Sequence, residues 1–127
     1  EHIYSNVIPL HKAKETLNFL YGIDFKVILI TARDESFRQI TTDWLKEHDI
    51  KYTELYHEDT KAPLAAEMNI ELFIEDNQVN AVQIAQKDIN VLLMDKYHNQ
   101  DIKDLNLIHR VNNWTDIREY IDQYFNL

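Results

Sequence analysis

Residues 25–34 read FKVILITARD, an apolar run that passes directly into a short polar turn. The run Phe25–Ile30 is short and rich in β-branched residues, which predicts a strand buried on both faces. A helix is predicted just after the turn, over about 36–48. Its apolar residues recur at helical spacing and are Phe37, Ile40, Trp44 and Leu45. This strand followed by an amphipathic helix is the first sign of an α/β pattern.

The rest of the chain repeats the alternation. Pro9 and Gly22 bracket a predicted helix, with Pro in its first turn and Gly at its end. Further strands are predicted at 52–56, 72–74 and 91–94, and further helices at 63–68, about 79–84 and 114–124. Such alternation with short connections predicts an α/β fold with a mostly parallel sheet and right-handed crossovers.

The composition suits one compact domain. The chain has 127 residues, of which 45% are apolar and 28% charged, so it can build a core and is not expected to be disordered. The formal net charge is -9 and the basic residues are scattered, so no nucleic-acid polymer is expected as a partner. The same charge neither requires nor forbids a homodimer.

The chain lacks cysteine, a long apolar segment and glycine-rich loops, and each of these absences excludes a class of protein or site. Cysteine is absent, which excludes a disulfide and a thiolate metal site and fits a cytoplasmic protein. The longest apolar run, Val27–Ile30, is too short to span a bilayer, so no membrane partner is expected. A single glycine, Gly22, excludes glycine-rich phosphate loops of the dinucleotide and P-loop types.

Polar residues follow the predicted strands at the ends where the sites of open parallel sheets gather. Thr31–Asp34 follow the first strand, Glu75–Asn77 follow the third, and Lys61 precedes a helix. A hydroxyl and an ammonium hold phosphate oxygens, and carboxylates hold Mg²⁺, so these residue types suit phosphoryl chemistry. We therefore predict that Thr31, Lys61 and Asp76 face one hollow.

Each of these residues also has a purely structural interpretation. Thr31 can end a strand and begin a turn, and Lys61 can be a solvated lysine near a helix start. Asp76 can be the N-cap of the helix that follows it. The pair of Glu75 and Asp76 is harder to explain structurally, because adjacent like charges repel unless a cation or a helix dipole compensates them.

Four segments in order carry a family resemblance. Val27–Arg33 resembles the second motif of the haloacid dehalogenase superfamily, a hydrophobic strand that ends in Thr or Ser. Lys61 resembles the third motif, and Leu72–Asn77 resembles the fourth, a strand that ends in an acidic pair. Val91–Asn99, followed by Arg110–Trp114, is similar to the tail of the 5′(3′)-deoxyribonucleotidase-like branch. The resemblance covers nearly the whole chain and implies a three-layer Rossmann-like core.

The resemblance also implies a function, namely a Mg²⁺-dependent phosphohydrolase that acts on a small phosphate monoester such as a nucleotide. Its reaction runs through an aspartyl-phosphate intermediate, which is nucleophilic catalysis by a carboxylate. The residues implied at the phosphate are Thr31, Ala32, Arg33 and Lys61. Asp76 would bind Mg²⁺, and Glu75 would support it or reach the metal through water.

The chain departs from the family pattern at the nucleophile. In the family this is the leading Asp of an Asp-x-Asp motif on the first strand, and no Asp-x-Asp occurs in the 127 residues. The family places that strand in the middle of the sheet, between the strand that ends at Thr31 and the one that ends at Ile74. We therefore expect residues 1–8 to be the tail of an absent cap, and residues 9–127 to be an incomplete core that is inactive alone.

Loss of a central strand has a structural consequence. Two buried strand edges would lack hydrogen-bond partners, at about 1–3 kcal/mol for each unsatisfied group. Residues 1–127 alone are thus predicted not to hold the family's core architecture: the parent polypeptide supplies the strand, the strands rearrange, or another copy fills the gap. The alternative function is a catalytically inactive domain for binding or regulation. A receiver domain fits poorly, because no acidic cluster comes early in the chain.

Overall fold

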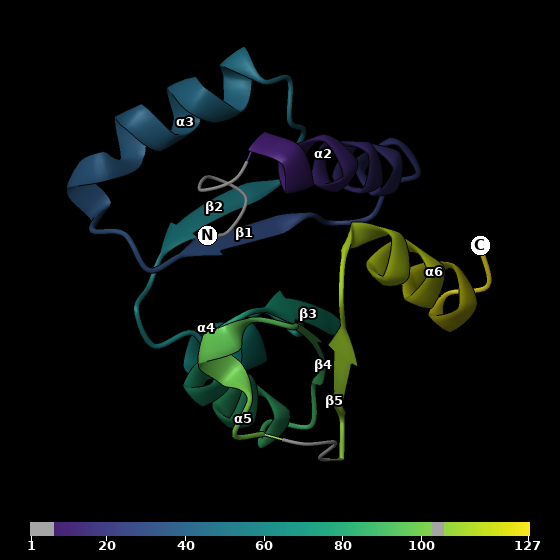
Figure 1. The fold of residues 1–127 in the computed structure, drawn as a ribbon. Coiled ribbons are helices and arrows are strands. Elements are labelled where there is room, and N and C mark those ends of the chain that lie inside the picture. The colour runs from purple at the N-terminus through teal and green to yellow at the C-terminus, as the bar shows by residue number, and fades with distance from the viewer. Residues whose placement is uncertain (1–6, 103–105) are drawn as a thin grey trace. The chain divides into compact units, whose positions relative to one another are not determined.

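The computed structural model describes residues 7–102 and 106–127. The chain divides into two compact units, Glu1–Asp59 (unit 1) and Thr60–Leu127 (unit 2), and each unit is described by itself. The elements of both units are labelled in Figure 1. Helices and strands alternate along the chain and all strand pairs are parallel, so the predicted α/β class is confirmed.

The described part of unit 1, residues 7–59, contains two α-helices and a two-stranded sheet. Helix α2 (Val7–Gly22) leads into strand β1 (Ile28–Thr31), a short 3-10 turn (Glu35–Phe37) leads into helix α3 (Arg38–Glu47), and strand β2 (Glu54–His57) follows. Strands β1 and β2 pair in parallel, with Thr31 opposite His57 at their carboxyl ends. The predicted strand after Phe25 therefore exists, and its side chains at Leu29 and Ile30, which alternate between faces, are both buried.

Unit 2 contains a three-stranded parallel sheet in the order β3-β4-β5. Its elements are helix α4 (Ala62–Glu67), strand β3 (Leu72–Glu75), helix α5 (Gln78–Ala85), strand β4 (Asn90–Met94), a 3-10 turn (Tyr97–Asn99), strand β5 (Ile108–Val111) and helix α6 (Trp114–Tyr124). Helices α4 and α5 lie side by side next to this sheet (Figure 1). The core between them is apolar and consists of Ala62, Ala65, Ala81, Ile84, Ile89, Val91, Leu93 and Ile108.

The described strands thus form two sheets rather than one. Among the described residues, β1 pairs only with β2, and β3 pairs only with β4. The expectation that a central strand is absent stays a prediction. The sequence also predicted that Leu72–Ile74 is a buried strand. The strand exists, but its predicted burial is wrong, because all three side chains are only half-buried. The physical reason is that β3 lies at the edge of its sheet.

Two further predictions need correction. Strand β5 was not predicted, because His109 and Arg110 interrupt its apolar residues and only Ile108 and Val111 at its ends are buried. In the helix predicted over 36–48, the expected core residues Phe37 and Ile40 are exposed, and the buried face of α3 is formed by Thr41 and Leu45. Thr41 and Leu45 are four residues apart and so lie on one face of α3, whereas Phe37 precedes the helix and Ile40 lies off that face.

The helices share one kind of ending, in which an Asp or Asn adopts a left-handed backbone and an apolar residue follows. The left-handed residues are Asp24 (φ 69°), Asp49 (55°), Asn69 (55°), Asp88 (61°) and Asn126 (56°). In most of these turns, the amide of the apolar residue donates to the carbonyl five residues earlier, as Ile50 does to Leu45 at 3.0 Å. Gly22 has no positive φ, so it is the last residue of α2 and not the left-handed residue of its C-terminus.

The expectation for residues 1–8 falls mostly outside the described residues, since only Val7 and Ile8, the first residues of α2, are described. No helix among the described residues is long and apolar enough to cross a membrane.

Candidate functional site

A buried ion pair joins two of the predicted site residues in unit 2. Lys61 lies just before α4, its side chain is 3% exposed, and its Nζ is 3.1 Å from Glu75 Oε2. The Glu75 carboxylate ends β3 and is 2% exposed. The structural interpretation of Lys61 as a solvated lysine is therefore wrong. A lysine is rarely buried this completely without a paired charge, and here Glu75 supplies one.

The second oxygen of Glu75 holds the turn that carries Asp76. Glu75 Oε1 accepts hydrogen bonds from the backbone N–H groups of Asp76 at 3.0 Å and Asn77 at 3.2 Å. Asn77, not Asp76, is the N-cap of α5, because its side-chain oxygen accepts from Asn80 N–H at 2.9 Å. The interpretation of Asp76 as a helix cap is thus wrong as well, and its half-buried side chain is not used to start the helix.

The donor set of this turn fits Mg²⁺ in part. Mg²⁺ is commonly held by one or two carboxylates together with waters and phosphate oxygens. The Glu75 carboxylate is already bonded to Lys61 and to two backbone amides, so its geometry is that of a supporting group. Asp76 can offer one carboxylate oxygen. The described residues contain no group of three or more His, Cys, Asp or Glu side chains that could hold a metal.

The hydroxyl of Thr31 is presented at the carboxyl end of β1 in unit 1. Thr31 is fully buried, and its Oγ1 accepts a hydrogen bond from Arg33 N–H at 3.2 Å. A hydroxyl that accepts one bond still has its proton to donate, for example to an anion oxygen. Ala32 is half-buried and Arg33 is exposed, with its guanidinium 6.0 Å from the centroid of the Phe37 ring.

Sequence reasoning missed His57, which ends β2 opposite Thr31. Its Nδ1 is 3.0 Å from the Arg33 carbonyl oxygen, which can only accept, so Nδ1 carries a proton. In the neutral ring Nε2 is then an acceptor, and this atom is buried with no hydrogen-bond partner among the described residues. A signal was available, because His57 directly follows the strand predicted at 52–56, at the end where sites of parallel sheets gather.

A hollow of about 420 Å³ in unit 1 lies away from all of these residues. It is lined by the end of α2, one side of α3 and the residues that precede β2, among them Tyr21, Lys46 and Tyr52. These segments belong to the amino-terminal end of the strands, whereas the predicted site residues follow the carboxyl ends. The hollow is therefore not the candidate site.

The structure brings Lys61, Glu75 and Asp76 together in unit 2 through the ion pair and the turn. Thr31, Ala32 and Arg33 are consecutive at the end of β1 in unit 1. That Thr31 shares one hollow with Lys61 and Asp76 stays a prediction.

Three relatives carry nucleotidase names. A nucleotidase of Clostridium acetobutylicum is 34% identical over 101 residues, which are 78% of this chain and 52% of that protein. A protein of Bacillus subtilis named "Putative nucleotidase YqfW" is 35% identical over 123 residues, 94% of this chain and 63% of that protein. A protein of the same description from Halalkalibacterium halodurans is 31% identical over 104 residues, 80% of this chain and 53% of that protein. The chain thus spans between about half and two thirds of the length of these relatives.

No solved structure gives a significant match to the chain. A family model described as 5′ nucleotidase, deoxy (pyrimidine), cytosolic type C protein matches residues 1–125. The match includes the strand that ends at Thr31, the buried Lys61 and the acidic turn at Asp76. The chain therefore belongs to the 5′ nucleotidase, deoxy (pyrimidine), cytosolic type C family.

Proposed function

We propose that the protein is a Mg²⁺-dependent phosphohydrolase that removes phosphate from a small phosphate monoester, in particular a nucleoside monophosphate. The observation that carries the proposal is the buried Lys61, fixed by Glu75 at 3.1 Å directly beside the turn of Asp76. A cation held in a fixed place stabilises the charge of a transferring phosphoryl group without reorganising during the reaction. The nucleotidase names of the relatives and of the family support the nucleotide substrate.

Each predicted site residue has one task in this proposal. The Thr31 hydroxyl donates a hydrogen bond to a phosphate oxygen, and Ala32 and Arg33 shape the same turn. Lys61 neutralises the phosphoryl oxygens, and Glu75 keeps its ammonium in place. Asp76 contributes a carboxylate oxygen to Mg²⁺, which when bound supplies further positive charge to the phosphoryl group.

The nucleophile is proposed to be a carboxylate outside the 127 residues. It attacks phosphorus, the alcohol leaves with its oxygen, and water then hydrolyses the aspartyl-phosphate. Two observations support this: no Asp-x-Asp occurs in the chain, and the chain spans only 52–63% of its relatives. Residues 1–127 alone are accordingly expected to be inactive. A cytoplasmic setting is part of the proposal and is supported by the words "cytosolic type" in the family description.

The proposal is tested on the full-length protein with a panel of substrates. Purified protein with Mg²⁺ is expected to release phosphate from an aryl phosphate and, faster, from deoxyribonucleoside 5′-monophosphates. Addition of a chelator should stop the release, and fresh Mg²⁺ should restore it. A full-length protein that releases no phosphate from any member of the panel would refute the proposal.

The task of Thr31 gives a separate prediction. Thr31→Val keeps the shape of the buried side chain and removes the hydroxyl, so it is expected to lower kcat/KM about 10²–10³-fold, the usual effect of deleting one donor to a developing charge. Thr31→Ser retains the hydroxyl and should stay within about tenfold of the wild type. Steady-state kinetics on an aryl phosphate measure both variants. Equal kcat/KM values for the two variants would show that the Thr31 hydroxyl does not bind the phosphate.

A further inference from the structure

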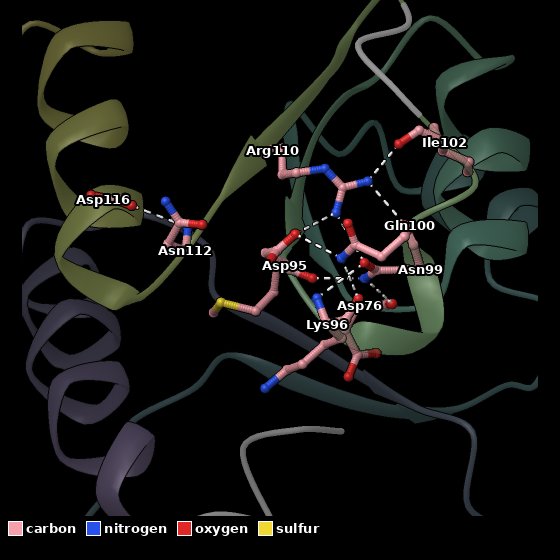
Figure 2. A network of polar contacts seen from close by, with 10 residues as sticks. Asp76, Asp95, Lys96, Asn99, Gln100, Ile102, Arg110, Asn112 and Asp116 are labelled. Carbon is pink, nitrogen blue, oxygen red and sulfur yellow. Dashed lines mark hydrogen bonds and ion pairs between the residues drawn. The ribbon is translucent and has the colours of Figure 1, made fainter.

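Asn99 is a fully buried polar residue of unit 2 to which sequence reasoning gave no role. All four hydrogen-bonding positions of its side-chain amide are used (Figure 2). Nδ2 donates to the carbonyl oxygens of Met94 at 2.7 Å and Asp76 at 2.8 Å. Oδ1 accepts from Lys96 N–H at 3.0 Å and from Arg110 Nη1 at 3.0 Å. A buried amide avoids a desolvation penalty only when it is satisfied in this way.

The bond to Asp76 ties Asn99 to the acidic turn. The turn is held on its amide side by Glu75 Oε1, which accepts from Asp76 N–H and Asn77 N–H. It is held on its carbonyl side by Asn99 Nδ2. Both peptide groups that flank the Asp76 Cα are therefore fixed. Glu75 holds the preceding one, and the following one is held by Glu75 through the Asn77 N–H and by Asn99, 23 positions later in the chain, through the Asp76 carbonyl. With both peptide groups fixed, the direction of the Asp76 side chain is restricted to its own rotamers.

Arg110 of β5 holds Asn99 in turn. Its Nη1 donates to Asn99 Oδ1 and, at 2.8 Å, to Asp95 Oδ1. Its Nη2 donates to the backbone carbonyls of Asn99, at 2.9 Å, and Ile102. Hydrogen bonds from Gln100 and Arg110 hold the pKa of the Asp95 carboxyl below its usual value, so the carboxylate stays ionised beside the guanidinium. The planar fork of arginine can satisfy these four acceptors, and a lysine cannot.

We propose that Asn99, held by Arg110, is a positioning residue that fixes the backbone of Asp76 and thereby the direction of its metal-binding carboxylate. This inference rests on the proposed function, since it takes Asp76 as a ligand of Mg²⁺. Outer-shell partners that orient a metal ligand typically change metal affinity by about 10–100-fold when they are replaced. A residue that only fills the core would instead change stability and leave the metal affinity as it is.

The test uses Asn99→Asp in the full-length protein. Aspartate has the same shape but no N–H groups, so the carbonyl of Asp76 loses its donor. Titration calorimetry with Mg²⁺ alone is expected to show about tenfold weaker binding than in the wild type. The added negative charge would by itself attract the cation, so weaker binding reports the displaced Asp76. In the metal-free protein, hydrogen exchange at the amides of Asp76 and Asn77 should become faster.

Asn90→Asp is the matched control in the same unit. Asn90 begins β4 at the opposite end of the sheet, and its side-chain amide contacts Tyr124 and His109. This variant should keep the wild-type Mg²⁺ affinity and the wild-type exchange rates at the Asp76 turn. Arg110→Lys keeps the charge and loses the fork, so it should weaken Mg²⁺ binding in the same direction by a smaller factor.

The outcomes separate this inference from the proposed function. A wild-type protein that hydrolyses phosphate esters with Mg²⁺, and whose Asn99→Asp and Arg110→Lys variants bind Mg²⁺ as the wild type does, overturns the positioning role alone. A wild-type protein without Mg²⁺ binding and without phosphatase activity overturns the proposed function, and the positioning role with it. If Asn99→Asp fails to fold, the Mg²⁺ affinity of Arg110→Lys decides the question.

Discussion

Replacing Glu75 with glutamine in the full-length protein is expected to lower the free energy of unfolding by about 3–5 kcal/mol. Glutamine keeps an oxygen that can accept from the amides of Asp76 and Asn77, so the backbone of the turn retains its partner. The ammonium of Lys61, however, loses its counter-charge while it stays buried at 3% exposure. The change is large because one partner of a buried ion pair loses its charge, and urea unfolding followed by circular dichroism measures it.

Two further variants show whether the loss comes from the buried charge. Adding Lys61→Met to Glu75→Gln removes the buried ammonium that has lost the Glu75 charge and keeps the length of the side chain, so the double variant should regain more than half of the lost stability. Asp122→Asn breaks the half-exposed pair with Arg118 on α6 and should cost less than about 1 kcal/mol. If Glu75→Gln lowers the free energy of unfolding no more than Asp122→Asn does, the pair of Lys61 and Glu75 is not a buried ion pair.

Asp76→Asn is expected to lower kcat/KM for a phosphate monoester on the order of 10³-fold in the full-length protein. The substitution replaces the charged ligand of Mg²⁺ by a neutral one and so removes several kcal/mol of charge stabilisation from the transition state. The cap of α5 is Asn77 and the backbone bonds of the turn remain, so the fold of the turn should be kept. Steady-state kinetics over a range of Mg²⁺ concentrations measure the loss.

Asp88→Asn provides the control for this experiment. Asp88 is exposed, lies just before β4 at the opposite end of the sheet from Asp76, and has a left-handed backbone that asparagine adopts readily. It changes the net charge by the same amount, so it should leave kcat/KM within about twofold of the wild type. Equal activity of Asp76→Asn and the wild type would mean that Asp76 does not bind the metal.

The sequence predicted those strands and helices whose buried residues are apolar and recur in a clear pattern. Val27–Ile30 and Val91–Met94 are apolar without interruption, and each supplies most of the residues of a parallel strand. Helix α6 has its boundaries as predicted, because Trp114, Ile117 and Ile121 all face the core. Strand β5 was missed because two of its four residues are polar, and one of them, Arg110, points into a polar network and not into water.

The sequence predicted which residues belong to the candidate site, but it did not predict the hydrogen bonds and ion pairs between them. The rule that polar residues after parallel strands form sites pointed to Thr31 and Asp76. It did not show that Lys61 and Glu75, fourteen residues apart, form a buried pair. Nor could it find Asn99, because an asparagine in a polar segment gives no sign of burial until the partners of its amide are known.

The helix endings of this chain have a consequence for its denatured ensemble. Left-handed positions are usually occupied by glycine, which also leaves a disordered chain with the widest choice of conformations. Here Asp and Asn take these positions, and the whole chain contains one glycine. Their side chains restrict the backbone before folding as well as after it, so less backbone entropy is lost when the helices form. The steric strain of these five left-handed residues is therefore offset by the lower backbone entropy of the denatured ensemble.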